Sequence, residues 1–254
     1  MMKAILAAAA FALSGACAAA GQPPIRFVLT FDDGPAPTTA TVLDTLARNP
    51  VQPGAKAIFF VQTRAGGSAD LMRRTYAEGH LLAVHTGTPQ GHVSHMALST
   101  EELEQSLAFA KADIASLADG AAPRFVRPPF WFYDRDTLAC YERAGLAMLL
   151  TDITARDGTV LGINLVPGKE LMIRAQLERI KQEVAEGELP VLDGAVPVVA
   201  TFHDVNSSTA RNLSDYLEFL VDAARGAGLS LAPRPFYDRR EDLERAAALR
   251  ARRL

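Results

Sequence analysis

Short apolar runs alternate with amphipathic stretches along most of the chain. The runs are rich in β-branched and aromatic residues, as buried strands are, and they span 26–31, 55–61, 81–85, 124–127, 146–152, 196–202 and 229–231. The stretches between them repeat apolar residues every three or four positions, which predicts helices. The clearest helix starts at Ser99, which forms a capping-box pattern with Glu102 and precedes the apolar stripe Leu103, Leu107 and Ala110.

Strands that alternate with helices usually pair in parallel, with the helices outside the sheet. Seven such units follow one another without a linker in a chain of 254 residues, a length typical of a single α/β barrel. The pattern therefore predicts the α/β class and a distorted (β/α)7-type barrel with parallel strands. A doubly wound open sheet is the alternative. The Arg-rich end, 239–254, is predicted to be a solvated helix.

The first twenty residues have a different composition. Lys3 precedes the apolar run 5–13, and small residues follow at 16–20, which is the layout of a secretory signal peptide. The run is shorter than the roughly 20 residues that cross a bilayer. We expect residues 1–20 to be a signal peptide and 21–254 to be the catalytic domain of an exported protein, periplasmic or secreted, without stable membrane insertion after cleavage. Lipid attachment at Cys17 is the alternative.

Chemically capable side chains stand where the predicted strands end. They are Asp32 and Asp33 after the first strand, then His85, Arg127, Asp152 and His203. In a parallel barrel these ends share one face, where barrel enzymes build their active sites. Two histidines and one carboxylate with open positions form a hydrolytic metal site, typically for Zn²⁺. A second carboxylate can then act as a base, and a separate histidine as an acid.

Four segments resemble the motifs of the polysaccharide deacetylases, the NodB-homology carbohydrate esterases. Residues 30–35 read TFDDGP, residues 127–130 read RPPF, His85 and Thr86 resemble the start of the H-[S/T]-x-x-H motif, and residues 202–204 resemble the late L-x-H motif, with Thr201 in place of leucine. The resemblance covers about 26–231, in family order. It implies a barrel of about seven parallel strands and the removal of acetyl groups.

The resemblance also implies a role for each matched residue. Asp32 would be the general base, Asp33 a metal ligand, and Arg127 the residue that orients the base. His203 would protonate the departing amine, and the backbone N–H of Phe130 would help to hold the oxyanion.

The spacing of the histidines departs from the family pattern, in which the ligands are four positions apart. Here six residues separate His85 from His92, and His95 follows. We expect His92 to be the third ligand, because the run of residues from His92 to the Ser99 cap has the length expected between the second histidine ligand and the next helix. His95 is the alternative.

Two further features concern the substrate side of the site. The family's D-x-x-D-W motif corresponds to residues 151–158, which lack the tryptophan. Either Asp152 or Asp157 of this segment is expected to tune His203. Asp152 is preferred because it stands at a strand end. An aromatic run, 130–133, follows the arginine motif. It predicts stacking on sugar rings by Phe130 and above all by Trp131.

These observations predict a metal-dependent hydrolase that removes N-acetyl groups from an amino-sugar polysaccharide or oligosaccharide of the peptidoglycan or chitin type. The net charge of −3 lacks the basic surplus of a nucleic-acid-binding domain, so no nucleic-acid partner is expected. A non-catalytic carbohydrate-binding barrel and an esterase acting on O-acetylated glycan are the alternatives.

Overall fold

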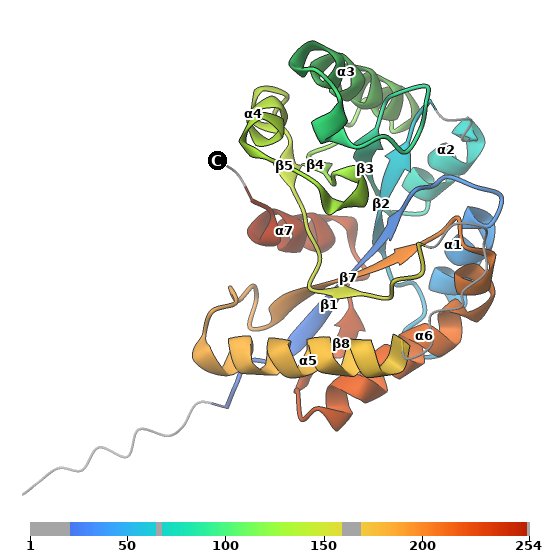
Figure 1. The fold of residues 1–254 in the computed structure, drawn as a ribbon. Coiled ribbons are helices and arrows are strands. Elements are labelled where there is room, and N and C mark those ends of the chain that lie inside the picture. The colour runs from blue at the N-terminus through green and yellow to red at the C-terminus, as the bar shows by residue number, and fades with distance from the viewer. Residues whose placement is uncertain (1–20, 65–67, 159–168, 253–254) are drawn as a thin grey trace, which may run out of the picture.

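The predicted parallel α/β barrel is confirmed by the structure, a computed structural model that describes residues 21–64, 68–158 and 169–252. Seven strands pair in parallel in the order β5-β4-β3-β2-β1-β7-β6, and β8 pairs with the start of β1 (Figure 1). The strands are β1 (Ile25–Asp32), β2 (Ala57–Gln62), β3 (Leu81–Thr86), β4 (Phe125–Val126), β5 (Ala147–Met148), β6 (Ile153–Thr154), β7 (Val196–His203) and β8 (Leu231–Phe236).

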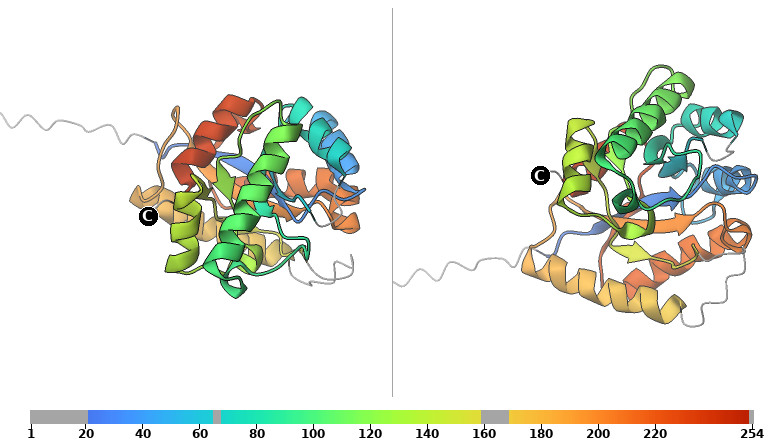
Figure 2. Two further views of the ribbon diagram at one scale, coloured as in Figure 1. Left: turned by 90° about the horizontal axis from the view of Figure 1, so that it is seen from above. Right: turned by 45° about the horizontal axis from the view of Figure 1, so that its top comes forward.

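Six helices cover the outside of the sheet and pack on one another in the order α4-α3-α2-α1-α6-α5 (Figure 2). They are α1 (Thr39–Arg48), α2 (Ala69–Ala77), α3 (Thr100–Leu117), α4 (Arg135–Arg143), α5 (Lys169–Glu186) and α6 (Ser207–Gly226). The capping box predicted at Ser99 and Glu102 is present at the start of α3. Two short 3-10 helices, η1 (His95–Ala97) and η2 (Pro129–Trp131), lie in loops beyond β3 and β4.

The strands are buried on both faces, and each face has its own core. Phe27, Leu29 and Phe31 of β1 pack toward the outer helices, whereas Val28 belongs to a second cluster on the inner face. Helix α7 (Arg240–Arg250) fills that inner face with its buried residues Leu243, Ala246 and Ala247. The terminal helix is therefore amphipathic, with its apolar face in the core. The prediction of a merely solvated helix was wrong.

The predicted strand 146–152 is split in two. Leu149 still donates to Val126 of β4, but Asp152 donates to Val199 of β7, so the segment passes from one edge of the sheet to the other. Between these points Arg127 donates from Nε to the carbonyl of Leu149 at 2.9 Å and from Nη2 to that of Leu150 at 3.1 Å. The guanidinium takes the place of a neighbouring strand, and the barrel is open there.

The expected signal peptide, residues 1–20, and the alternative lipid site at Cys17 lie outside the described residues. Within the part of the chain that the structure describes, no helix combines the length and the hydrophobicity needed to span a bilayer.

Candidate active site

Two adjacent aspartates end β1 and point in different directions. Asp32 is almost fully buried and faces the barrel interior, where its Oδ1 accepts from Arg127 Nη1 at 2.8 Å. The backbone of Asp33 has φ 75°, a left-handed conformation that aspartate tolerates better than most residues. This turn ends the strand and aims the Asp33 carboxylate at the histidines instead. One strand end thus supplies two carboxylates to two different environments.

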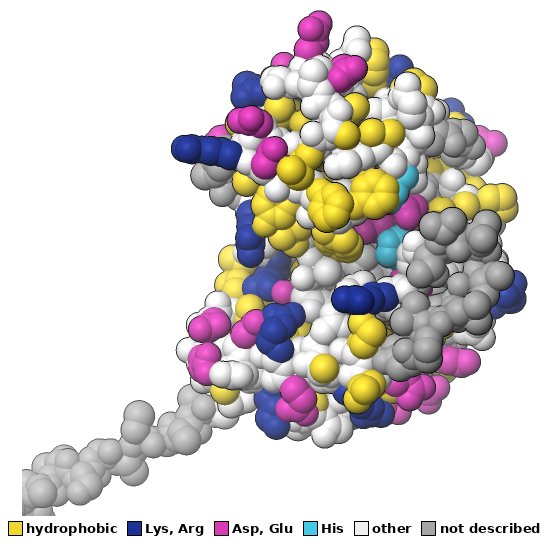
Figure 3. Space-filling view, viewed as in Figure 1, with side chains coloured by type: hydrophobic (Ala, Val, Ile, Leu, Met, Phe, Trp, Pro, Cys, Tyr) yellow, Lys and Arg dark blue, Asp and Glu magenta, His cyan; other side chains and the backbone are white. Residues whose placement is uncertain are grey.

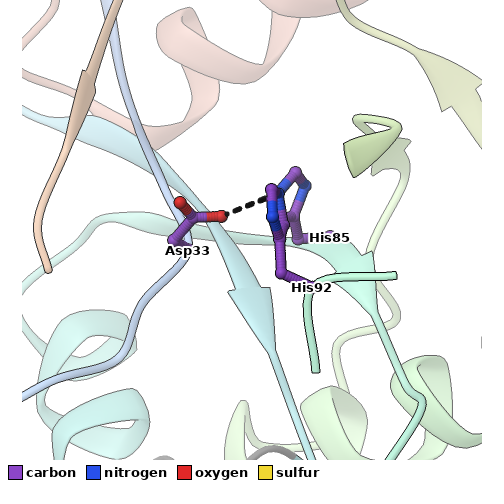
Figure 4. A group of neighbouring side chains, drawn as sticks. All are labelled: Asp33, His85 and His92. Atoms are coloured by element: carbon purple, nitrogen blue, oxygen red, sulfur yellow. Dashed lines mark ion pairs between the residues drawn. The ribbon is translucent and has the colours of Figure 1, made fainter. Parts of the chain in front are cut away.

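The structure brings together the three residues expected to bind metal. Oδ1 of Asp33 lies 3.1 Å from His85 Nε2 and 3.2 Å from His92 Nε2, and one ligand atom from each residue lies within 4.8 Å of the others. Figure 4 shows the carboxylate facing both imidazole rings. His85 comes from β3, whereas His92 is carried by the loop that follows it.

The chemistry of this cluster fits a cation. Nδ1 of His85 lies 2.8 Å from the carbonyl oxygen of Arg127. Because a carbonyl can only accept, Nδ1 carries a proton, and Nε2 is the ring nitrogen that faces Asp33 and can bind a cation. Oδ1 of Asp33 is buried and has no hydrogen-bond partner among the described residues. Burial raises the pKa of Asp33, but the neighbouring imidazole of His85 outweighs it, with His203 and His92 adding to that effect, and lowers the pKa to about 2.

His95, the alternative ligand, lies elsewhere. It begins η1, is fully buried, and its Nδ1 lies 2.7 Å from the hydroxyl of Tyr141. Burial, reinforced by the charge of His85, lowers the pKa of His95 to about 3. In the structure the side chain packs into the core beside α4.

Arg127 is held by more than its ion pair with Asp32. The guanidinium is fully buried and lies 4.1 Å from the centre of the Phe60 ring. Its Nη1 also donates to the Thr30 hydroxyl at 2.7 Å, and that hydroxyl lies 2.8 Å from the hydroxyl of Thr201. Arg127 therefore has little freedom, and Asp32 is fixed through it.

His203 ends β7, and Asp157 holds its ring. Nδ1 of His203 lies 2.8 Å from Asp157 Oδ1, and its backbone N–H donates to Asp157 Oδ2 at 3.0 Å. Asp157 is fully buried and also accepts from the Thr209 hydroxyl at 2.6 Å. Burial lowers the pKa of His203, but the hydrogen bond and charge of Asp157 outweigh it, with Asp32 and Asp33 adding to them, and raise it to about 9.

The expectation that Asp152 tunes His203 was wrong. Asp152 Oδ2 accepts from the backbone N–H of Val199 at 2.8 Å, and Oδ1 pairs with Arg250 of α7 at 2.6 Å. Val199 precedes His203 by four residues, roughly 13 Å along a strand, so this register keeps Asp152 away from the imidazole. The alternative, Asp157, makes the contact.

Aromatic side chains line one side of the site. Phe130 and Phe132 are 49% and 60% exposed, and the ring of Phe130 lies 4.2 Å from that of His92. Trp131 is half-buried, with its ring 5.0 Å from the Arg127 guanidinium. Figure 3 shows hydrophobic side chains gathered beside histidine and acidic side chains on this face. The exposed rings available for stacking are Phe130 and Phe132, and Trp131 is the less accessible of the predicted pair.

Close approaches between glycine backbone and functional side chains complete the site. A Cβ on Gly158 would lie 2.5 Å from His203 Nε2, and one on Gly34 would lie 2.2 Å from Asp204 Oδ2. Asp204 is buried, and burial above all raises its pKa to about 7. Glycines directly after functional aspartates were the available signal.

Fold and site together define a class, the α/β-barrel hydrolases that carry an Asp-His-His cluster at the carboxyl ends of their strands. The chain belongs to the polysaccharide deacetylase family, whose model matches residues 20–149, half of the chain. It is similar to a chitooligosaccharide deacetylase of Bradyrhizobium sp., with 28% identity over 82% of this chain and 88% of the relative.

The chain is also similar to two other proteins. A chitin deacetylase of Arthroderma benhamiae is 35% identical over 79% of this chain and 48% of its own length. The structure of the chitin deacetylase from Colletotrichum lindemuthianum has a TM-score of 0.60 at 24% identity and covers 85% of this chain and 92% of that one. At this identity the structural likeness supports the fold alone.

Proposed function

We propose that this protein is an exported, metal-dependent deacetylase that hydrolyses N-acetyl groups on an amino-sugar polymer of the chitin or peptidoglycan type. One observation carries the proposal. The Asp33–His85–His92 cluster follows directly on a buried carboxylate fixed by arginine, and Asp33 Oδ2 lies 4.0 Å from Nε2 of an imidazole that is paired with a carboxylate. A base and an acid on separate strands, beside a cation site, are the groups that amide hydrolysis requires.

We assign the cation as Zn²⁺, held by Asp33, His85 and His92, because one carboxylate and two imidazoles with open positions are a ligand set of hydrolytic zinc sites. When bound, the ion polarises the acetyl carbonyl and makes water in contact with it more acidic. Asp33 remains ionised and His85 directs Nε2 toward Asp33, so both are prepared to bind it.

Asp32 is the residue that we assign as general base. Arg127 engages its Oδ1, which leaves Oδ2 to accept the proton of the attacking water. The buried guanidinium also keeps this carboxylate in one orientation. The backbone N–H of Phe130, in the loop that carries the exposed rings, is the donor that we assign to the oxyanion.

His203 is the residue that we assign as general acid. An amine needs a proton to leave, because the amide anion is too basic to depart unaided. Asp157 holds Nδ1, so Nε2 is the nitrogen that donates to the substrate. Gly158 leaves room for this atom, because any side chain there would lie against it. The sugar ring would rest on Phe130 and Phe132.

Acetate release tests this proposal directly. The purified protein, loaded with Zn²⁺, is incubated with chitin oligosaccharides, peptidoglycan fragments and acetylated xylan. We expect acetate from an N-acetylated substrate, and none after chelation. Release from the xylan alone would identify an O-acetyl esterase. Binding of the oligosaccharides without acetate release from any substrate would identify a non-catalytic carbohydrate-binding barrel.

Export has its own test. We propose that the mature chain begins near Ala19 or Gly21, outside the cytoplasm. N-terminal sequencing of the natural protein is expected to find this new terminus. An intact Met1 in cytosolic protein would contradict the proposal, and a lipid on Cys17 would favour the anchored alternative.

A further inference from the structure

The two histidines of the Asp33–His85–His92 cluster are held in different ways. His85 lies within β3 and is almost fully buried, and its Nδ1 is fixed by the carbonyl of Arg127. The side chain of His92 is 32% exposed, and no hydrogen bond from the described residues holds its second ring nitrogen. With six residues between the two, neither strand nor helix geometry places His92. Something else must bring it to the cluster.

The loop between them is held in a compact conformation by hydrogen bonds of buried hydroxyl groups. The Thr88 hydroxyl lies 3.1 Å from that of Thr86 and donates to the carbonyl of Gly91 at 2.9 Å, while the Thr88 N–H donates to the Thr86 hydroxyl at 3.2 Å. Gly91 returns a backbone hydrogen bond to Thr88 at 3.2 Å. Thr88 is thus bonded to both ends of the loop, and His92 is the next residue after Gly91.

This loop is also attached to α3 by a hydrogen bond. Gly87 donates its N–H to the hydroxyl of Ser106 at 3.0 Å, and both are buried. A Cβ on Gly87 would lie 2.1 Å from the Ser106 carbonyl oxygen, so the loop backbone lies directly on the helix. The His92 ring itself lies near two other rings, with its centre 5.1 Å from that of His85 and 4.2 Å from that of Phe130. The loop backbone therefore decides where this ring can lie.

We propose that the hydroxyls of Thr88 and Ser106 position His92 as a metal ligand, and so determine the metal affinity of this chain despite the long histidine spacing. These are positioning residues that act through His92. Groups that orient ligands typically contribute 10- to 100-fold to metal affinity. The inference rests on the metal site of the proposed function, but not on the reaction that takes place there.

The test is zinc affinity, measured on metal-stripped protein by competition with a chromophoric chelator. We expect Thr88→Val to weaken zinc binding by about 10- to 100-fold and Thr88→Ser to restore it to near the wild-type value, because serine keeps the hydroxyl. Ser106→Ala should weaken it as well. The matched control is Thr75→Val, which removes a buried hydroxyl that donates to Leu71 within α2, and it should leave zinc affinity unchanged.

A double-variant comparison separates positioning from general damage to the fold. In a His92→Ala background, Thr88→Val should weaken zinc binding no further, because the residue it acts through is gone. Wild-type zinc affinity in Thr88→Val, or an equal loss in the His92→Ala background, would overturn the inference. If wild-type protein binds zinc as expected but releases no acetate, the proposed reaction fails while this inference stands.

Discussion

Polar side chains that pair with the backbone are buried at the amino end of the parallel strands, and carboxylate oxygens without a partner among the described residues are buried at the carboxyl end. At the amino end, the Gln52 amide pairs with both backbone groups of Phe236 at 2.9 Å, and His80 Nδ1 accepts from the N–H of Ala57 at 3.1 Å. At the carboxyl end, Asp33 Oδ1 and Asp204 Oδ1 are buried without a partner among the described residues.

The difference distinguishes polar groups that stabilise the fold from polar groups that serve the active site. A buried polar atom that pairs with the backbone stabilises the fold, whereas one left without a partner needs a ligand or stores free energy. Backbone strain follows the same division. Four of the residues other than glycine with positive φ lie beside the site: Asp33, Phe130, Trp131 and Arg156. Changes at the carboxyl end should therefore affect zinc binding or turnover, and changes at the amino end should affect stability.

The largest effect is expected for the base and the acid. Asp32→Asn and His203→Ala should each lower kcat by about 10²- to 10⁴-fold, roughly 3 to 5 kcal/mol of activation free energy, while zinc content stays near wild type. Acetate-release kinetics and metal analysis check this. Both variants should also lower the melting temperature, because each leaves a buried charge without its partner. Near-native kcat in Asp32→Asn with zinc bound would move the assignment of the base to Asp204.

Gly158→Ala should have the next largest effect. Its Cβ would displace the His203 ring, and a misplacement of about 1 Å can cost about 10²-fold in rate. We expect kcat to fall on this scale with unchanged zinc affinity. Gly226→Ala is the matched control, because a Cβ there would meet only Arg174 Nη1 at 3.7 Å, an ordinary contact. Equal kinetics in the two variants would argue against the close approach to His203.

At the amino end, His80 should make the fold sensitive to acid. Burial, reinforced by the charges of Lys56, Arg240 and Arg74, lowers its pKa from 6.5 to about 3. Below pH 6.5 the unfolded chain takes up a proton that the folded chain does not. The free energy of unfolding should therefore fall by about 1.4 kcal/mol per pH unit from this group, down to its folded pKa.

His80→Asn isolates this contribution, because its Oδ1 can still accept from the Ala57 N–H but does not titrate. Urea unfolding of the metal-free protein between pH 7 and 4.5 should show a shallower pH dependence in this variant than in the wild type. Parallel curves would contradict the prediction. Acetate release near neutral pH should be the same in both proteins.

The smallest effect is expected for Gln52→Ala. It leaves the buried N–H of Phe236 without an acceptor, whereas the Phe236 carbonyl keeps its hydrogen bonds from Arg26. The free energy of unfolding should fall by about 1 kcal/mol, the low end for an unpaired buried backbone group. Chemical denaturation measures the loss, and zinc affinity should stay unchanged. A change in zinc affinity would mean that the two ends of the strands are coupled.

The sequence alone determined the order of strands and helices, because burial on a sheet or on one helix face leaves a local period in the chain. It also determined that Asp32, Asp33, His85, Arg127 and His203 meet, because parallel strands bring their carboxyl ends to one face. These inferences need only the path of the chain. They do not need its exact register or the packing of its loops.

Only the tertiary structure decided which neighbour each of these groups meets. Asp157 rather than Asp152 holds His203, because the register of β6 against β7 places Asp152 level with Val199. His92 rather than His95 faces Asp33, because loop packing turns His95 toward Tyr141. Both outcomes depend on contacts between residues far apart in the chain, which leave no local pattern. The burial of helix α7 was also decided by the tertiary structure, because its apolar face is buried by packing against the inner side of the barrel.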